Sequence, residues 1–212
     1  MWTRAELKQR GKASFFGNYW VSVGAWVIFG LIIGFGSAVG SFAFGVGSIV
    51  AAVFLAGPLT VGITRFTLKN RNSEGKVEDI FSVFDSNYMN LVTVELLKNL
   101  FICLWSLLFI IPGIIKSYEY RMVDYLLAEN PEMDYREALD RSRQMMDGEK
   151  WNAFVLDLSF LGWNILSAFT FGLLSLFFVT PYMGQTNAEL YVTLSNNNPT
   201  VEYTNYKEED NF

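Results

Sequence analysis

ASFFGNYWVSVGAWVIFGLIIGFGSAVGSFAFGVGSIVAAVFLAGPLTVGIT, from Ala13 to Thr64, is a segment without any Asp, Glu, Lys or Arg. A helix needs about 20 mostly apolar residues to cross a membrane once. A charge at mid-bilayer costs several kcal/mol, so a charge-free run of this length is typical of membrane segments. Four glycines lie near its middle, where the chain would reverse direction: Gly36, Gly40, Gly45 and Gly47. The segment therefore predicts a pair of membrane helices.

The composition also indicates a membrane protein. Of the 212 residues, 51% are hydrophobic and 17% are aromatic, and the charged residues cluster between apolar blocks. A chain of this length corresponds to one compact domain, which we assign to residues 1–199. Residues 200–212 form a polar acidic tail that contributes to the net charge of −5. We expect this tail to be solvated and flexible.

The residue types exclude several classes of function. The chain has no histidine and a single cysteine, Cys103, which lies within an apolar run. An internal disulfide is therefore impossible, and we expect no metal site, no cofactor and no enzymatic activity. Nucleic acid is not an expected partner, because no basic stripe with a fold to present it is visible. We also expect no signal peptide, since no clear cleavage site follows the first apolar run.

Six apolar blocks are candidates for membrane helices. The first two are Tyr19–Ser37 and Val46–Leu68, and the second of these contains a predicted kink at Gly57-Pro58. The later blocks contain charges or prolines and lie at Leu91–Ile115, Ile114–Asn130, Trp151–Phe171 and Leu173–Leu194. The block Ile114–Asn130 is ambiguous, because it mixes apolar and charged residues. As a membrane helix it brings the total to six, and as a surface helix it leaves five.

The basic residues distinguish these topologies, because cytoplasmic segments carry an excess of Lys and Arg. Basic residues gather in three groups: Arg4, Lys8, Arg10 and Lys12; Arg65, Lys69, Arg71 and Lys76; and Arg136, Arg141, Arg143 and Lys150. With six helices all three groups lie on one side of the membrane, together with the C-terminus. With five helices the third group lies on the wrong side. We therefore predict an all-α, polytopic membrane bundle of six helices in three hairpins, in the cell membrane, with both termini cytoplasmic.

The six-helix topology requires the chain to reverse direction near Ile111-Pro112-Gly113. Proline lacks an N–H and clashes with the carbonyl four residues back, and the following glycine adopts conformations that other residues avoid. We predict a tight turn at Pro112-Gly113, on the outer face of the membrane. The alternative is one long kinked helix, because proline is also tolerated within membrane helices.

A short amphipathic stretch precedes each predicted hairpin, which suggests a weak internal repeat at the cytoplasmic surface. The first is Thr3–Phe16, in which Thr3 and Glu6 have the spacing of a capping box. The second is Val77–Phe84, whose predicted apolar face consists of Val77, Ile80, Phe81 and Phe84.

The third amphipathic stretch is Tyr135–Met146, with a possible capping box of Asp134 and Glu137. Its Arg141 and Arg143 are suited to anionic lipid, but acidic residues lie between the basic ones. We therefore expect this stretch to act chiefly as a brace at the membrane interface.

Three motifs resemble a known family. They are LWSLLFIIPGIIK at Leu104–Lys116, EALDRSRQMM at Glu137–Met146 followed by Gly148, Lys150 and Trp151, and LSFLGW at Leu158–Trp163. On these motifs the chain resembles the "domain of unknown function 975" family of bacterial integral membrane proteins, from about Arg4 to Tyr191. The resemblance implies a membrane location, mostly in Gram-positive bacteria. It implies no activity, because the family's motifs have no assigned chemistry.

Polar groups at membrane depth are the candidate functional residues. This possible intramembrane cluster comprises Glu95, Lys98, Lys116, Glu119, Arg121, Asp124 and Asp157. The spacing i, i+3 allows three pairs on helix faces: Glu95 with Lys98, Lys116 with Glu119, and Arg121 with Asp124. Asp157 is alone in its apolar block, where Arg121 or Tyr118 could donate to it. The cluster either lines a wet cavity for an ion or a lipid headgroup, or consists of satisfied pairs that dock the helices; we favour the second.

These observations predict a non-enzymatic scaffold or accessory protein of the bacterial cell envelope, in contact with membrane lipids and with another membrane protein. The alternative is a small transporter or channel-like protein that uses the polar residues of the fourth helix. A continuous polar cavity that reaches mid-membrane favours the transporter. A bundle closed by packed aromatic side chains favours the scaffold. An intramembrane enzyme is the least expected class.

Overall fold

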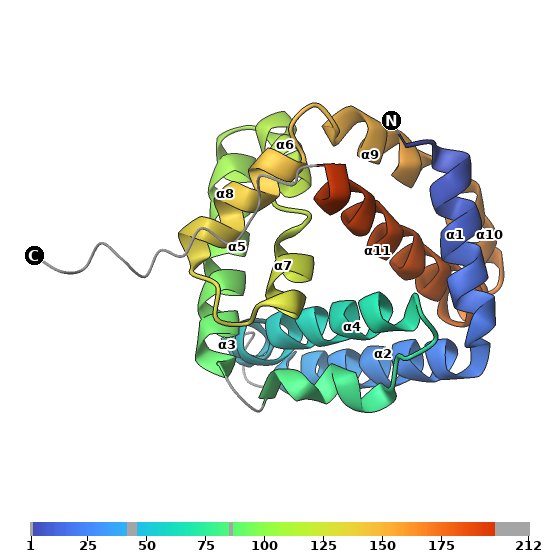
Figure 1. Cartoon of the computed structure of the whole chain (residues 1–212). Helices are drawn as coiled ribbons and strands as arrows, with labels where there is room; N and C mark the ends of the chain where they lie inside the picture. Colours follow the sequence, from blue (N-terminus) through green and yellow to red (C-terminus); the bar gives the residue numbers. More distant parts are fainter. Residues whose placement is uncertain (1, 42–45, 85–86, 198–212) are drawn as a thin grey trace, which may run out of the picture.

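The chain is all-helical, as predicted, in the part that the structure describes. The computed structural model describes residues 2–41, 46–84 and 87–197, and within these ranges it contains no strand (Figure 1). The predicted acidic tail and part of the first glycine-rich connection lie outside these ranges.

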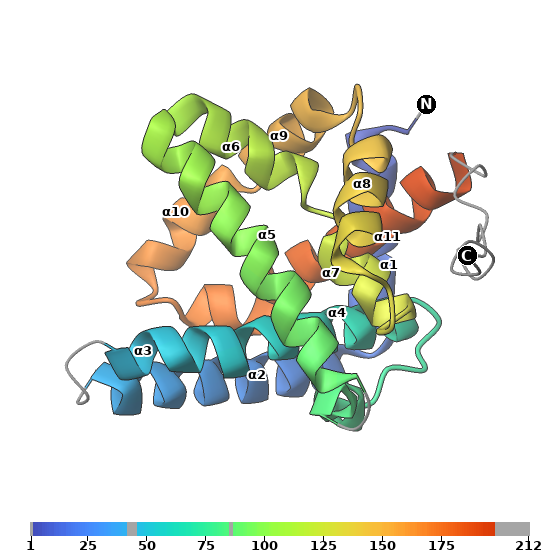
Figure 2. The same cartoon turned by 90° about the vertical axis from the view of Figure 1, so that its left-hand side faces the viewer.

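The first hairpin pairs two long helical rods. One rod is α2 (Tyr19–Ser41), and the other consists of α3 (Val46–Ala51), the π-helical turn η1 (Ala52–Ala56) and α4 (Gly57–Asn70) in direct succession. The rods lie side by side (Figure 2). Both agree with the predicted positions of the first two membrane helices.

The π-helical turn η1 lies directly before Gly57-Pro58, where the sequence predicts a kink. Pro58 has no N–H to donate to the carbonyl of Phe54, four residues back. The hydroxyl of Tyr88 donates to that carbonyl from the start of the next hairpin. The proline thus changes the local helix type and leaves an acceptor that a neighbouring segment uses.

The second hairpin joins α5 (Tyr88–Leu108) to α6 (Ile110–Glu119), which pack along each other (Figure 2). The chain forms a hairpin here and not one long helix. The predicted position of the turn, however, is wrong. The reversal occurs at Phe109, whose backbone is extended with φ −156° and ψ 144°.

Pro112 and Gly113 lie in the first turns of α6 and have roles other than turning the chain. A proline in the first helical turn removes no helical hydrogen bond, since the first N–H groups of a helix have no partner within it. A Cβ atom on Gly113 would lie 2.1 Å from Ser106 Oγ and 2.7 Å from Ser106 Cα. The glycine therefore permits the close approach of α5 and α6.

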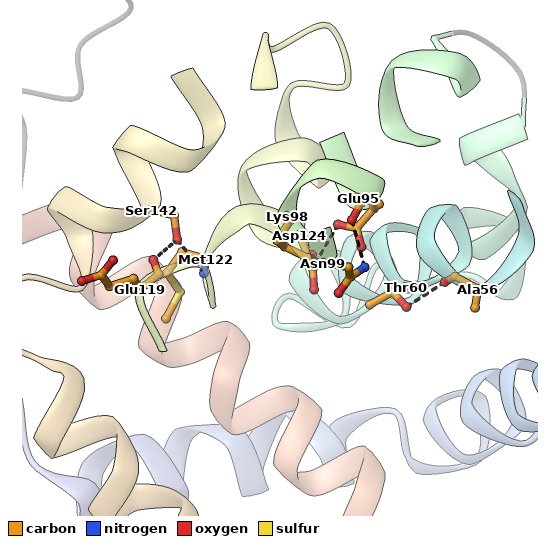
Figure 3. Close-up of polar contacts among 9 residues, drawn as sticks. All are labelled: Ala56, Thr60, Glu95, Lys98, Asn99, Glu119, Met122, Asp124 and Ser142. Atoms are coloured by element: carbon orange, nitrogen blue, oxygen red, sulfur yellow. Dashed lines mark hydrogen bonds and ion pairs between the residues drawn. The ribbon is translucent and has the colours of Figure 1, made fainter. Parts of the chain in front are cut away.

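The predicted fourth helix, Ile114–Asn130, is interrupted. After α6 ends at Glu119 the chain turns, and α7 (Val123–Glu129) follows. Ser142, from a later helix, contacts both sides of this turn: its hydroxyl donates to the Glu119 carbonyl at 2.6 Å and accepts from the Met122 N–H at 3.1 Å (Figure 3). The break is thus stabilised by a tertiary contact and not by a local proline or glycine.

The third hairpin consists of α9 (Lys150–Leu158) and α10 (Leu161–Phe169) on one side and of the π-helical turn η3 (Ser175–Val179) and α11 (Thr180–Asn197) on the other. The chain reverses at Phe171 and Gly172, whose φ angles are 51° and 82°. The left-handed conformation of Gly172 is one that glycine adopts without a steric cost.

The three amphipathic stretches form α1 (Arg4–Gly17), the 3-10 helix η2 (Val77–Phe84) and α8 (Tyr135–Met145). The capping box predicted for the first is confirmed: the Glu6 N–H donates to the Thr3 hydroxyl, and the Thr3 N–H donates to the Glu6 carboxylate, each at 3.3 Å. At the start of α8, Asp134 accepts from the Arg136 N–H, while Glu137 pairs with Arg141.

The predicted apolar face of Val77–Phe84 is partly wrong. Ile80 and Val83 are buried, whereas Phe81 and Phe84 are exposed. The reason is the helix type: a 3-10 helix has three residues per turn, so positions i and i+3 share a face.

The hairpins share one orientation. In Figure 2 the end of α2, the junction between α5 and α6 and the end of α10 all lie on the left, and α1 and α8 lie towards the right. Within the described ranges, three helices are long and apolar enough to cross a membrane: Tyr19–Val39, Tyr88–Leu108 and Lys150–Phe169. Only 17%, 28% and 22% of the apolar stretches of these three helices are buried, so most of this apolar surface faces outwards.

Candidate functional site

The predicted polar residues form three separate clusters and not one. In the first, the Lys98 ammonium of α5 lies between two carboxylates (Figure 3). It donates to Glu95 at 2.8 Å, as predicted, and also to Asp124 of α7. Glu95 and Lys98 are buried, and this ionic contact joins the second hairpin to the helix that follows it.

A cavity of about 450 Å³ lies beside this first cluster, between α5 and the rod of η1 and α4. Its lining is part apolar and part polar, and consists of Ala52, Val53, Ala56, Gly57, Thr60, Glu95, Leu96, Lys98 and Asn99. The Thr60 hydroxyl donates to the Ala56 carbonyl at 2.8 Å, and the Asn99 amide donates to the Glu95 carbonyl at 2.9 Å (Figure 3). π-Helical turns frequently occur at functional sites, and here one forms a wall of the cavity.

The second cluster is centred on Asp157 of α9. Arg121, in the turn between α6 and α7, donates to both of its carboxylate oxygens, at 2.6 and 2.7 Å. The Tyr118 hydroxyl donates to it at 2.8 Å, and Arg121 also donates to Asn187 at 2.9 Å. Both donors predicted for Asp157 are therefore confirmed.

The predicted pair of Arg121 with Asp124 is wrong. The prediction assumed one continuous helix, in which residues three apart share a face. Because the chain turns after α6, Arg121 lies outside both helices and contacts α9, while Asp124 contacts α5.

The third cluster surrounds the buried carboxylate of Glu119. Lys116 donates to it at 2.5 Å, which confirms the predicted pair, and Lys150 of α9 donates to its other oxygen at 2.7 Å. Arg143 of α8 lies 3.8 Å away. Three helices thus contribute a cation to one carboxylate.

Some polar contacts between distant segments were not predicted. Arg71, just after α4, forms a two-pronged contact with buried Glu189 of α11, at 2.6 and 3.2 Å. Lys8 of α1 donates to the carbonyl and hydroxyl of Ser159, both at 3.2 Å. Burial lowers the pKa of the Lys8 ammonium. The partners in these two contacts are 118 and 151 positions apart in the sequence, so residue spacing within a helix cannot predict them.

The chemistry of the three clusters is that of ion pairs that hold segments together. Each of the seven predicted residues has at least one oppositely charged partner. Among the residues that the structure describes, no three His, Cys, Asp or Glu side chains come together as candidate metal ligands.

Residues 107–198, from the end of α5 into α11, match the family described as "protein of unknown function (DUF975)". This match confirms the family resemblance that the sequence motifs predict. No curated protein and no solved structure matches the chain significantly. The family description assigns no activity, so the function must be argued from the structure.

Proposed function

We propose that this chain, which carries the DUF975 region, is an integral membrane protein whose six helical rods cross the cell membrane as three hairpins. The common orientation of the hairpins supports this topology (Figure 2). So does the outward-facing apolar surface of the three longest apolar helices. Both termini and the amphipathic helices α1 and α8 then lie at the cytoplasmic face, together with the basic groups.

Cysteine labelling tests this topology in a Cys103→Ala background. Phe171→Cys is placed at the tip of the third hairpin, where the side chain is 98% exposed, and Asp147→Cys is placed in the exposed connection between α8 and α9. In intact cells a membrane-impermeant thiol reagent should label position 171 and leave position 147 unlabelled until the cells are permeabilised. Labelling of position 147 from outside would exclude the six-rod topology.

We propose further that the protein is a non-enzymatic scaffold or accessory protein of the bacterial cell envelope. The observation that supports this role is that partly buried ion pairs connect the hairpins with one another. The Arg121–Asp157 pair joins the second hairpin to the third, and the Arg71–Glu189 pair joins the first to the third. A bundle cross-linked in this way is suited to holding a fixed surface and not to large movements.

Packed aromatic side chains add to this argument. Phe160, Tyr182, Phe178 and Phe15 form a continuous row, with ring centroids 5.2, 5.6 and 5.8 Å apart. The row joins α1 to the third hairpin and packs within the main hydrophobic core. Closure by aromatic packing favours the scaffold over the transporter.

The cavity beside Glu95 and Lys98 supports a second candidate, a small transporter or channel-like protein. Charged groups that line a cavity beside an interrupted helix are typical of transport sites. Ion flux into vesicles that contain the purified chain distinguishes the two roles. The scaffold predicts the same flux as in empty vesicles, whereas a flux that Lys98→Gln abolishes would establish the alternative.

A further inference from the structure

The cluster around Glu119 has an excess of positive charge. Three cations, Lys116, Arg143 and Lys150, lie within 4 Å of its single carboxylate. A second carboxylate, that of Asp140, reaches only Arg143, at 3.7 Å. The other two clusters differ from this one, because in them carboxylates equal or outnumber the cations.

The cations of this cluster are partly accessible. The side chain of Arg143 is 51% exposed and that of Lys150 is 31% exposed, whereas Glu119 is buried beneath them. The ammonium of Lys116 lies over the rings of Trp105 and Tyr120, at 5.5 and 5.7 Å from their centroids. The cluster therefore combines a buried carboxylate with a positive rim that consists of Lys116, Arg143 and Lys150.

An exposed apolar surface leads directly to this positive rim. Ile111, Ile114 and Ile115 of α6 are exposed in the residues just before Lys116, and Trp105 of α5 is exposed beside it. Trp151, next to Lys150, is 70% exposed. Tryptophan at the boundary between apolar and charged surface is typical of the membrane–water interface.

We propose that Lys116, Arg143 and Lys150 bind the phosphate of an anionic phospholipid at the cytoplasmic face. The acyl chains lie along the exposed isoleucines of α6. Basic pockets between membrane helices on the cytoplasmic side are suited to such headgroups. This inference rests on the proposed membrane topology. It favours lipid over free phosphate, because a free anion has no use for the apolar surface.

Native mass spectrometry of the full chain in detergent micelles measures this binding. We expect phosphatidylglycerol to bind more tightly than phosphatidylcholine, and Arg143→Gln to weaken phosphatidylglycerol about fivefold, the effect of one cation near an anionic surface. Arg143 is the residue to change, because its contact with Glu119 is the longest of the three, so the fold should survive. Arg143→Lys should retain the binding, since it keeps the charge.

Arg10→Gln is the matched control, because it removes the same charge from an exposed site on α1. Equal weakening by this control would show a non-specific charge effect and overturn the proposal. The proposal would also be overturned if Arg143→Gln bound phosphatidylglycerol as tightly as the unchanged chain. The same holds if millimolar inorganic phosphate displaced the lipid as well as added phosphatidylglycerol does. Washing membranes with alkaline carbonate distinguishes failure of the membrane topology from failure of the lipid site. Release of the chain would refute the topology, whereas a chain that is retained but shows no lipid preference would refute the lipid site alone.

Discussion

Replacement of Arg121 by methionine should strongly destabilise the protein. The side chain donates to both oxygens of Asp157 and to Asn187, at 2.6 to 2.9 Å. Removal of one partner from a buried ion pair costs about 3–5 kcal/mol, because the remaining charge is left without compensation. The Asp157 side chain keeps 31% exposure, so we expect the lower end, about 3 kcal/mol. For a chain of this size, that corresponds to a Tm lower by about 6–12 °C.

Thermal unfolding in detergent, followed by tryptophan fluorescence, measures this effect. The double variant Arg121→Met/Asp157→Leu removes both charges and should recover at least half of the lost stability, since no carboxylate then remains without a partner. Arg10→Met, at an exposed site, should shift the Tm by less than about 2 °C. The reasoning fails if Arg121→Met has as little effect as this control. It also fails if the double variant is destabilised by the sum of the two single changes.

Two further changes test the packing. Gly113→Ala should lower the Tm, because the new Cβ would overlap Ser106 and overpacking costs about 1–3 kcal/mol. The control Gly30→Ala has open space around it and should be neutral or stabilising, so equal Tm shifts in the two variants would refute the close approach of α5 and α6 at Gly113. Gln185→Leu should leave the Tm unchanged or raise it, because both polar atoms of this buried side chain lack a hydrogen-bond partner in the described structure; a clear loss of stability would reveal an unseen partner.

Much of the helical architecture could be predicted because its causes are local. The charge-free segment after Ala13 forms the first hairpin, and the capping box of Thr3 with Glu6 begins α1. The pairs Glu95–Lys98 and Lys116–Glu119 follow from the geometry of one helical turn, in which residues three apart are neighbours. Such contacts need no knowledge of the rest of the fold.

The second hairpin shows where local reasoning is insufficient. Pro112-Gly113 has the composition of a turn, yet the chain reverses at Phe109, which carries no turn signal. Proline fits the first turn of a helix as well as a tight turn, so its presence does not decide between them. Gly113 is required by the proximity of Ser106 on the neighbouring helix, a contact that only exists once α5 and α6 are packed.

The amino-acid sequence alone specifies the helical class, the approximate positions of the apolar rods and the ion pairs within single helical turns. These features depend on residue spacing and on the transfer of apolar side chains out of water, which act over a few residues. Two features depend on the packing of the helices: the break between α6 and α7, where Ser142 contacts both sides of the turn, and the partner of Arg121. A charge pairs with whichever opposite charge the packing of helices brings within reach, and that proximity is a property of the whole bundle.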